Sequence, residues 1–469
     1  MSETEADGEG KLALGIDLGT TSVKVVVYAR NRGEIIAKQS KDTQANVPSD
    51  LGIDGNKQDV PKILSAVHSC VSRLPKDLLR QVTTIGVCGQ MHGVTLWKCQ
   101  PPPHDNEKTF KLEIDKTQVS HLYTWQDSRC DSNFLKSLPP SSSHLPIHPG
   151  YGCATLFWFA RNKPEKLAKY NRCGTVQDLM VNLLCGTEDV AMSYQNAASF
   201  GYFLTEEGRF EVEAMEKANF PVELLPKRIL RAGETAGHLG HTWFGVPAGV
   251  PIGVALGDLQ CSVFALLKGQ DEAVMNISTS AQLTYVHPDF RGEAGDSGSI
   301  EYFPYFGGEY LAVAASLNGG NTLASFVKML QQWTMDLGFS VPQSRVWEKL
   351  ISLGQEDSAV SSMRIEPLLL GERHDPHKTA SVTGISLDTL HLGTVFRSLC
   401  SGVIQNLHSM MSQEILKKKG IKKIVGNGSG LVRNPVLQKE VQHWYKLPLE
   451  LGHSGDAALG AAIAGVASE

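Results

Sequence analysis

A polar turn between two apolar runs near the N-terminus carries groups suited to binding phosphate. Residues 12–16 and 23–28 are apolar, and the second run is rich in β-branched side chains, so the pattern predicts a hairpin of two strands. Gly19 lets a bulky anion approach the backbone of the turn. The neighbouring hydroxyl and amide groups can donate hydrogen bonds to phosphate oxygens. The hydroxyl residues are Thr20, Thr21 and Ser22.

One carboxylate precedes this turn and one lysine follows it. Asp17 would repel a bare phosphate, but it can face one through Mg²⁺, which prefers carboxylate and water oxygens. Lys24 adds positive charge close to the same place. The turn therefore predicts a site for a metal-bound phosphate, with Asp17 as the metal ligand. An ordinary turn rich in glycine and threonine is the alternative, because so short a motif also occurs by chance.

A second copy of the motif occurs in the other half of the chain. Residues 275–281 follow an apolar run and precede another strand-like run, 282–286. In this copy Asn276 takes the place of Asp17, and the turn again carries hydroxyl residues. These are Ser278, Thr279 and Ser280. Two such hairpins, one in each half, predict two similar domains that face one nucleotide. Because the second copy has no carboxylate, we assign the metal to the first.

Neutral polar residues follow the strand predicted for residues 82–88. Gln90 and His92 stand directly beyond its end. In open α/β sheets, ligands lie outside the carboxyl ends of the strands, and these two side chains are suited to recognising hydroxyl or carbonyl groups. The alternative for His92 is a loop histidine that is bonded to the backbone.

A second polar segment, residues 123–130, contains an aromatic ring, an acid and a base. Trp125, Asp127 and Arg129 alternate along it, so an extended backbone would turn all three side chains to one side. A sugar has an apolar face and hydroxyl groups, and this set of side chains matches both. A surface ion pair beside a packed indole ring is the alternative.

Asp258 is the candidate general base. An apolar strand, residues 252–257, ends directly before it, and a helix is predicted for residues 259–267. Asp258 could simply cap that helix. Its place just before the second hairpin favours a catalytic role, because a kinase needs a carboxylate that accepts the proton of the attacking alcohol.

Two glycine-containing turns in the second half are suited to a nucleotide. Gly320 belongs to a glycine pair that opens a helix, and Gly428 lies between a predicted strand, residues 421–425, and the helix that begins near Asn434. Glycine permits close approach of a ligand to the backbone, and helix N-termini favour anions.

Composition sets the general class of the chain. Its 469 residues suffice for two domains, and a net charge of −5 without long charged blocks gives no support for nucleic acid or membrane-surface binding. The first ten residues do not have the pattern of a signal or transit peptide, and we find no apolar run near 18 residues. The nine cysteines contain no CxxC pair and indicate reduced thiols, so we expect a cytoplasmic protein.

Taken in order, these segments resemble the FGGY family of carbohydrate kinases over nearly the whole chain, from about residue 12 to residue 467. The resemblance implies an α/β fold of two actin/hexokinase/Hsp70-like (ribonuclease H-like) domains, 11–268 and 269–469, with a nucleotide and sugar cleft between them. It is carried most clearly by residues 89–94, 124–127, 195–199, 255–260, 276–280, 316–321 and 370–374.

The resemblance also implies residue roles. It makes Asp258 the catalytic base and Asp17 the ligand of Mg²⁺. The residues implied for ATP are Gly19, Thr20, Thr21, Ser22, Lys24, Ser278, Thr279, Ser280, Gly320, Gly428 and Asn434. The residues implied for the sugar are Gln90, Met91, His92, Trp125, Asp127, Asp258 and Gln260.

Within the family, the motifs are most similar to those of the branch that phosphorylates the seven-carbon ketose sedoheptulose, which implies ATP and sedoheptulose as substrates. A xylulose-type ketose kinase is the alternative in the same class. An actin- or Hsp70-like nucleotide switch is the alternative in another class, although such a switch needs no sugar site. The sequence does not set the length of the sugar pocket, and a monomer and a homodimer are equally compatible with it.

Overall fold

The computed structural model describes residues 12–52, 55–98, 112–292, 298–356, 362–373, 375, 377–452 and 455–465. His374, at the end of one of the family-like motifs, lies outside this set, as do the outermost residues of the two expected domains. The chain forms two compact units. The first consists of Met1–Ala265, Phe303–Glu309 and Asp456–Glu469, and the second of Leu266–Tyr302 and Tyr310–Gly455. The division at 268/269 stays a prediction.

The first unit is built on a sheet in the order β14-β15-β6-β1-β2-β3, with β16 also paired to β6. Strands β1, β2 and β3 are antiparallel, whereas β6 runs parallel to β1, and β15 parallel to β6. The strands are β1 Leu12–Leu18, β2 Ser22–Ala29, β3 Glu34–Asp42, β6 Val82–Gly89, β14 Thr235–His238, β15 Pro251–Gly253 and β16 Leu256–Gly257. Every residue of β1 is buried, which explains its nearly continuous apolar sequence.

The second unit repeats this arrangement with the order β19-β20-β18-β17-β23-β24. Strands β17, β18 and β20 are antiparallel, β23 runs parallel to β17, and β24 parallel to β23. The strands are β17 Glu272–Ile277, β18 Ala281–His287, β19 Ile300–Pro304, β20 Tyr310–Ser316, β23 Lys423–Asn427 and β24 Leu449–Leu451. Both units therefore begin with the same antiparallel strands followed by parallel ones, as the repeated hairpin predicts.

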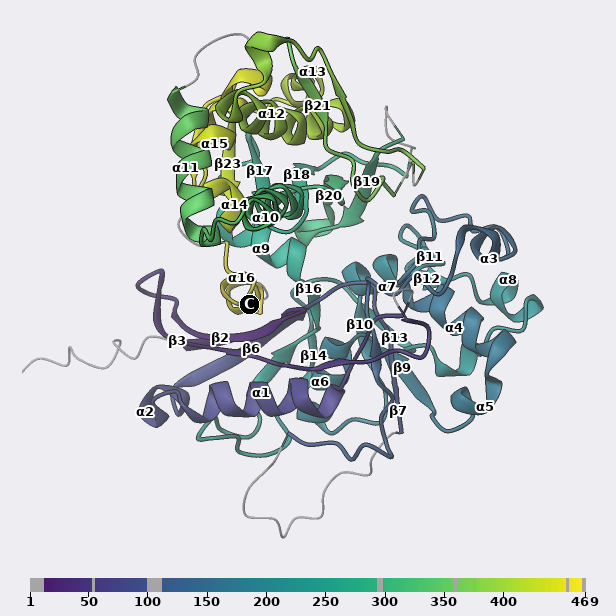
Figure 1. Ribbon diagram of the computed structural model, residues 1–469. Helices are drawn as coiled ribbons and strands as arrows, with labels where there is room; N and C mark the ends of the chain where they lie inside the picture. Colours follow the sequence, from purple (N-terminus) through teal and green to yellow (C-terminus); the bar gives the residue numbers. More distant parts are fainter. Residues whose placement is uncertain are drawn as a thin grey trace, which may run out of the picture. The chain divides into compact units, whose positions relative to one another are not determined.

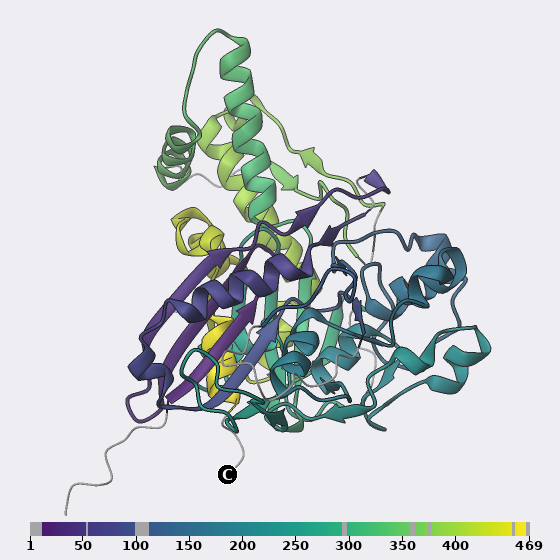
Figure 2. The same cartoon turned by 90° about the horizontal axis from the view of Figure 1, so that it is seen from below.

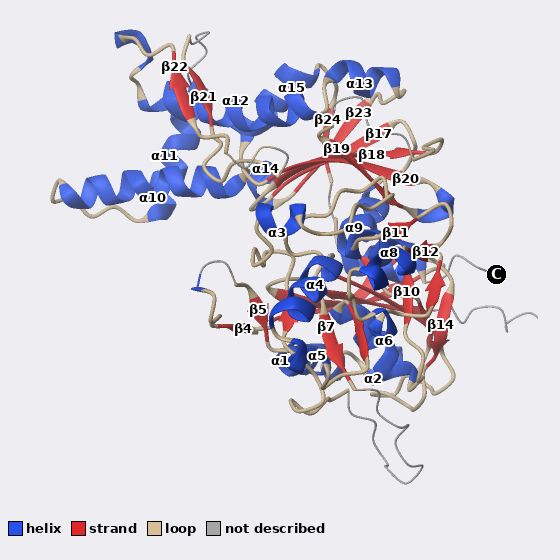
Figure 3. Cartoon of the chain, turned by 90° about the vertical axis from the view of Figure 1, so that its right-hand side faces the viewer, coloured by secondary structure: helices blue, strands red, loops and turns tan. Residues whose placement is uncertain are grey.

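Helices cover these sheets, as Figure 1 and Figure 3 show for each unit. Helix α1 (Val60–Ser72) follows β3, and its N-cap Asp59 accepts a hydrogen bond from the backbone N–H of Lys62. Helix α12 (Leu392–Met410) has the corresponding place in the second unit and buries most of one face in its core. The other helices of eight or more residues are α4 Gly152–Asn162, α6 Val176–Cys185, α9 Asp258–Leu266, α10 Gly320–Asp336, α11 Gln343–Glu356, α15 Pro435–Tyr445 and α16 Ala457–Ala464.

Short elements complete the two units. The strands are β4 Asn46–Val47, β5 Lys57–Gln58, β7 Thr95–Trp97, β8 Leu122–Tyr123, β9 Arg172–Gly174, β10 Ala191–Ser193, β11 Phe203–Leu204, β12 Arg209–Phe210, β13 Arg228–Leu230, β21 Arg364–Glu366 and β22 Ser381–Thr383. The short helices are α2 Lys76–Leu79, α3 Ser132–Lys136, α5 Pro164–Leu167, α7 Tyr194–Phe200, α8 Val212–Lys217, α13 Gln413–Lys418 and α14 Ser429–Val432.

Helix α16 lies directly on the sheet of the first unit, although it comes from the end of the chain (Figure 2). Its residues are small, and glycines of the sheet leave room for it. A Cβ atom on Gly15 would lie 1.9 Å from the backbone oxygen of Ala458, and one on Gly86 would lie 1.9 Å from that of Ala461. These glycines are required by the close approach of helix and strand. The interpretation of this segment as close packing on the sheet is confirmed.

Within the described residues, no helix combines the length and the apolar character that crossing a bilayer requires.

Candidate active site

The first predicted hairpin is present and is tied to neighbouring segments. Strands β1 and β2 are joined by a three-residue turn, and Asp17 lies directly opposite Lys24 in their register. The backbone oxygen of Thr20 accepts a hydrogen bond of 2.7 Å from Gln58 Nε2. The Thr20 hydroxyl accepts one of 3.1 Å from Trp125 Nε1. A residue predicted for phosphate and a residue predicted for the sugar are therefore in direct contact.

The second predicted hairpin has the same turn length and an exposed tip. Strands β17 and β18 flank Ser278, Thr279 and Ser280, and the first two of these residues are exposed. The start of α10 lies against the turn, because the Gly320 N–H donates to the Ser278 backbone oxygen at 2.9 Å. A Cβ on Gly320 would lie 2.1 Å from that same oxygen, so no larger residue fits here without a shift.

A cavity of about 730 Å³ opens beside this second hairpin, within the second unit. It is lined by the turn, by the N-terminal part of α10, by α11 and by the segment from Ser429 to Asn434. Two of the three residues expected on the adenosine side, Gly320 and Asn434, line it. The third, Gly428, directly precedes the lining segment and has a φ of 87°, which favours glycine.

Sequence reasoning missed three side chains of this cavity. Trp347 and Ile351 come from α11, and Arg433 precedes α15. Trp347 and Ile351 are spaced like any other pair on an amphipathic helix, so no local signal distinguishes them from core residues. Their position offers an aromatic and aliphatic wall for a base, and Arg433 offers a positive charge for phosphate.

Three carboxylates of the first unit interact near the first hairpin. Burial raises the pKa of Asp17 to about 8, and the negative charges of Asp258 and Asp456 add to this effect, whereas Lys24 opposes it. Burial also raises the pKa of Asp258 to about 6, against the backbone hydrogen bond from Leu259 and the charge of Lys24. The surroundings of these carboxylates therefore do not stabilise the ionised forms of Asp17 and Asp258. Asp456, which caps α16, was not among the expected site residues.

This arrangement fits a divalent cation. A cation beside Asp17 and Asp258 would favour the ionised form of both carboxylates. Within the described part of the chain, no three His, Cys, Asp or Glu side chains form a ready-made metal cluster. Mg²⁺ does not need such a cluster, since it is commonly held by one or two carboxylates together with water and substrate phosphates.

Of the predicted sugar residues at the end of β6, Gln90 and Met91 are buried and His92 is half-buried. Gln90 donates through Nε2 to Gln58 Oε1 at 3.0 Å, and Gln58 in turn donates to Thr20. The His92 ring is stacked on Tyr151 at 4.5 Å between centroids, and its Nδ1 lies 3.0 Å from the Ser199 backbone oxygen. Met91 is buried, and its sulfur lies 3.0 Å from where a Cβ on Gly257 would stand.

The segment around Trp125 differs from expectation. The chain turns at Trp125 and Gln126 and is not extended, because the Thr124 backbone oxygen accepts from the Asp127 N–H at 3.0 Å. The prediction that Trp125, Asp127 and Arg129 turn to one side through alternation is therefore wrong. Asp127 is 1% exposed and accepts from Arg129 Nε at 2.6 Å and Nη2 at 2.8 Å. It also accepts from the Asn56 N–H, so protein groups already engage both of its oxygens.

Two further buried amides support the same site: Gln195, from the family-like segment 195–199, and Gln177, which the sequence did not single out. Gln195 Oε1 accepts from the Gly257 N–H at 3.1 Å, directly before Asp258. Gln177 Nε2 donates to the backbone oxygens of Gly89 and Gln90 at 3.2 Å. Through Gln195, segment 193–199 therefore holds the end of β16, directly before Asp258. Glutamine has no characteristic spacing, so only the fold reveals this role.

Several of these amides keep one polar atom without a partner among the described residues. The atoms are Gln90 Oε1, Gln177 Oε1, Gln195 Nε2 and Gln260 Oε1. Gln260 uses its other atom, Nε2, to donate to the Pro304 backbone oxygen at 3.4 Å. Buried polar atoms without partners are uncommon, and a ligand with several hydroxyl groups would satisfy atoms of this kind.

Comparison with known proteins places these features in a family. Residues 12–265 match the model of the N-terminal domain of the FGGY family of carbohydrate kinases. The chain is 45% identical to the sedoheptulokinase of Homo sapiens over 465 residues and to that of Mus musculus over 461, and each alignment covers 96% of both chains. It is 28% identical to the xylulose kinase of Escherichia coli over 158 residues, which cover 32% of this chain and 29% of that enzyme.

Solved structures confirm the fold. The xylulose kinase of Rhodospirillum rubrum superposes with a TM-score of 0.78 at 17% identity, covering 97% of this chain and 89% of that one. The glycerol kinase of Plasmodium falciparum with ADP gives 0.75 at 14% identity, covering 97% and 88%. The expected α/β fold with a pair of actin- and hexokinase-like domains is confirmed. The cleft expected between the domains stays a prediction.

Proposed function

The chain belongs to the FGGY family of carbohydrate kinases, and from this premise we propose that it transfers the γ-phosphate of ATP to the terminal hydroxyl of sedoheptulose. The products are ADP and sedoheptulose 7-phosphate, which feeds the pentose phosphate pathway in the cytoplasm. The observation that supports this substrate is the 45% identity to two sedoheptulokinases over almost the full length of each. The match to a xylulose kinase is weaker and shorter.

Asp258 acts as the general base. As the sugar hydroxyl attacks the γ-phosphorus, its O–P bond forms, the bond to the β-phosphate oxygen breaks, and the hydroxyl proton passes to the Asp258 carboxylate. A pKa of about 6 leaves this carboxylate mostly ionised at neutral pH, yet closer to the operating pH than an ordinary aspartate. The amide network through Gln195 holds the backbone before Asp258 and thereby fixes the position of the base.

The two hairpins bind the phosphates. Backbone amides and hydroxyls of residues 19–22 and 278–280 donate to phosphate oxygens, and Lys24 adds charge. Asp17 would hold Mg²⁺, which would supply positive charge to offset the negative charge of the phosphates. The adenosine part lies in the cavity beside the second hairpin, where Trp347 and Ile351 supply apolar contact.

The sugar lies against Trp125 and the buried amides. The indole ring offers a flat apolar face and is held by its hydrogen bond to Thr20. The unpartnered atoms of Gln90, Gln195 and Gln260 accept and donate hydrogen bonds to the hydroxyls of the ketose. Asp127 contributes by holding the turn that carries Trp125, through its ion pair with Arg129.

An ATP-coupled assay across sedoheptulose, xylulose, ribulose, fructose and glycerol tests the proposal. We expect the highest kcat/KM with sedoheptulose, by roughly ten- to two-hundred-fold over xylulose, because each added hydroxymethylene contact contributes about 1–3 kcal/mol. A higher kcat/KM with xylulose would show that the preferred substrate is a shorter ketose than sedoheptulose, and the family assignment would still hold. ATP turnover that no sugar stimulates, but a peptide does, would favour a nucleotide switch.

A further inference from the structure

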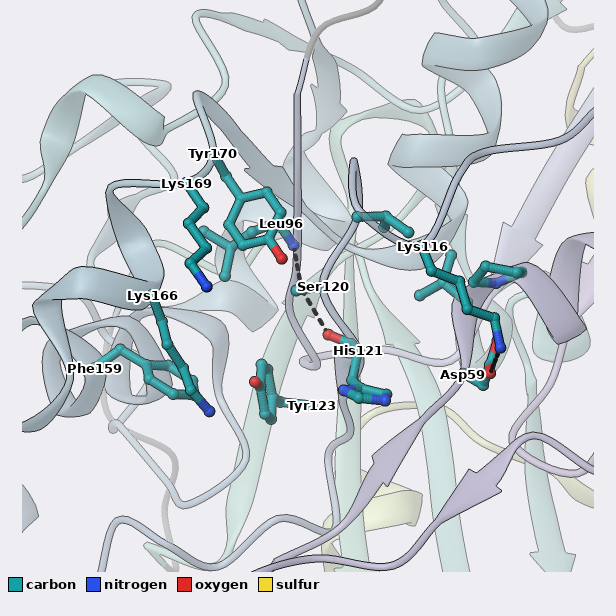
Figure 4. Close-up of a pocket in the computed structure, with 13 residues that line it drawn as sticks. Asp59, Leu96, Lys116, Ser120, His121, Tyr123, Phe159, Lys166, Lys169 and Tyr170 are labelled. Atoms are coloured by element: carbon teal, nitrogen blue, oxygen red, sulfur yellow. Dashed lines mark hydrogen bonds and ion pairs between the residues drawn. The ribbon is translucent and has the colours of Figure 1, made fainter.

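A second cavity lies in the first unit, apart from every residue assigned above to ATP, metal or sugar. It has a volume of about 280 Å³ and opens between the start of α1, strands β7 and β8, and helices α4 and α5. Figure 4 shows Lys166, Lys169 and Tyr170 on one side of it, and His121 and Lys116 on the other. Apolar side chains such as Val60 and Leu96 complete the wall.

Two of the three lysines of this cavity, Lys166 and Lys169, are exposed and lack partners among the described residues, whereas Lys116 is paired with Asp59. Neither the Lys166 nor the Lys169 ammonium forms an ion pair or a hydrogen bond with any residue that the structure describes. Lys166 only lies over the Phe159 ring, 5.8 Å from its centroid. The His121 ring likewise has no hydrogen-bond partner within the described ranges.

The nearby carboxylates do not compensate this charge. Asp59, the one carboxylate among the described residues that line the cavity, already accepts from Lys116 at 3.0 Å and caps α1. Asp50 is paired with Lys57 and Lys163. Burial and then the charge of Lys57 lower the pKa of His121; Asp59 opposes this effect, and Lys166 and Lys116 add to it. Burial and the charge of Lys163 likewise lower the pKa of Lys166, although Asp50 opposes this.

A phosphate group would satisfy this set of donors. Two free ammonium groups, an imidazole and the Tyr170 hydroxyl provide charge-assisted hydrogen bonds of the kind that bind phosphate. The volume of about 280 Å³ leaves room for more than a phosphate group, since one water molecule needs only about 10–15 Å³ by the same kind of measure. The remaining space and the apolar wall suit a small carbon skeleton attached to the phosphate.

We propose that this cavity is a binding site for a small phosphomonoester, in which Lys166, Lys169 and His121 hold the phosphate group. Lys116 and Asp59 form one edge of the site. Because none of the residues of the two hairpins line the cavity, a ligand here binds without displacing ATP from them.

The test follows the His121 ring by NMR in protein labelled with ¹³C-histidine, with neither ATP nor ketose present. His121→Gln identifies the resonance among the 15 histidines. Ribose 5-phosphate and inorganic phosphate are titrated separately at a pH near 6.5. We expect a saturable shift with both probes, a higher pKa of His121 in the complex, and at least tenfold tighter binding of ribose 5-phosphate.

Paired variants provide the control. Lys166→Gln with Lys169→Gln should weaken ribose 5-phosphate binding at least tenfold and raise the pKa of His121 even without ligand, since the repelling charge of Lys166 is gone. Lys417→Gln with Lys418→Gln removes two exposed lysines of α13 and should change neither quantity. Thermal melting checks that all variants are folded.

Three results would overturn the proposal. One is a response that does not saturate and is matched by chloride at equal ionic strength. Another is unchanged affinity in the variant that lacks Lys166 and Lys169. Equal affinity for both probes would show that the cavity binds the phosphate group alone and does not recognise a phosphomonoester. Because the readout does not involve catalysis, none of these results bears on the kinase function.

Discussion

The hairpins β1–β2 and β17–β18 have the same backbone arrangement but carry different charges. In the first, Asp17 lies opposite Lys24 on β2 and beside Cys88 on β6. In the second, Asn276 lies opposite Gln282 on β18 and beside Asn427 on β23. One strand pair therefore carries a carboxylate and an ammonium, and the other carries only amides. The repeat preserves the backbone arrangement of the hairpin, and at these strand positions only the first copy carries ionisable side chains.

The difference shows that equivalent positions of the two hairpins, such as Asp17 and Asn276, carry side chains with different chemical properties. Asp258 and Asp456 raise the pKa of Asp17, so the first hairpin belongs to a group of interacting carboxylates. The second hairpin instead borders a cavity with an aromatic wall. We therefore expect substitutions near the first hairpin to affect turnover and metal use, and those near the second to affect ATP affinity.

The largest effect is expected for Asp258→Asn. Loss of a general base reduces kcat by about 10²–10⁴, because the amide cannot accept the proton of the attacking hydroxyl. ATP binding, measured by calorimetry, should persist, since neither hairpin is altered. If Asp258 only caps α9, asparagine is nearly as good a cap and turnover should stay within about tenfold of the wild type. That outcome would remove Asp258 as the base.

A smaller effect is expected when the carboxylate of the first hairpin is replaced. Asp17→Asn should raise the Mg²⁺ concentration for half-maximal activity by at least about 10–100-fold, a range already seen when groups that merely support metal ligands are lost. The measurement is activity against free Mg²⁺ at saturating ATP.

The matched control transfers the carboxylate to the other copy. Asn276→Asp combined with Asp17→Asn exchanges the aspartate and the asparagine between the two hairpins. We expect no recovery of Mg²⁺ affinity, because Asp258 and Asp456 are neighbours of Asp17 in the first unit. Recovery in the double variant would mean that the two hairpins are interchangeable.

On the side of the second hairpin, Trp347→Ala should raise the KM for ATP by at least about fivefold with little change in kcat. Stacking of a base on an aromatic side chain contributes about 1–3 kcal/mol. Trp333→Ala is the control, since Trp333 is 55% exposed on α10 and does not line the cavity. An equal KM for the wild type and Trp347→Ala would remove the stacking role.

The smallest effect concerns stability without metal. The pKa of Asp17 is about 8 in the folded protein and near 3.8 in the unfolded chain, so its contribution to stability is full below pH 4 and is lost as the pH rises through 8. Asp17→Asn never ionises and escapes this loss. We expect its Tm to exceed that of the wild type by a few degrees at pH 8.5 and by less at pH 5.

Added Mg²⁺ should reduce that difference in Tm at pH 8.5, because the cation stabilises the ionised form of Asp17. The control is Asn276→Asp, which keeps Asp17: the difference in Tm between this variant and the wild type should not change when Mg²⁺ is added. A Tm difference that does not depend on pH would show that Asp17 is not protonated in the metal-free protein.

The elements that could be predicted from the sequence are those with local patterns. Both hairpins follow from apolar runs around a polar turn. The apolar run before Asp258 predicts one strand over residues 252–257, and the structure has two short strands there, β15 and β16. The repeat implies the shared part of the two sheets, whereas the outer strands β14 and β19 have no counterpart in the other unit. Each of these conclusions depends on residues that are close in the sequence or on a comparison of two segments.

The parts that could not be predicted depend on distant contacts. Gln58, Gln177 and Gln195 reach the site only through tertiary folding, and glutamine carries no spacing signal. The alternation of side-chain types around Trp125 predicts an extended segment, but the hydrogen bond from the Asp127 N–H to the Thr124 backbone oxygen closes a turn there. Trp347 has the helical spacing of an ordinary amphipathic helix and gives no sign of its cavity.

Helix α16 has a consequence for the order of events during protein synthesis. It completes the packing over β1 and β6, yet about 190 residues separate it from the main segment of the first unit. At about 5–20 residues per second, the ribosome needs roughly 10–40 s to add them. During that interval the first unit lacks α16. The face of β1 and β6 that α16 covers in the finished protein, with Gly15 and Gly86, is then open to chaperones.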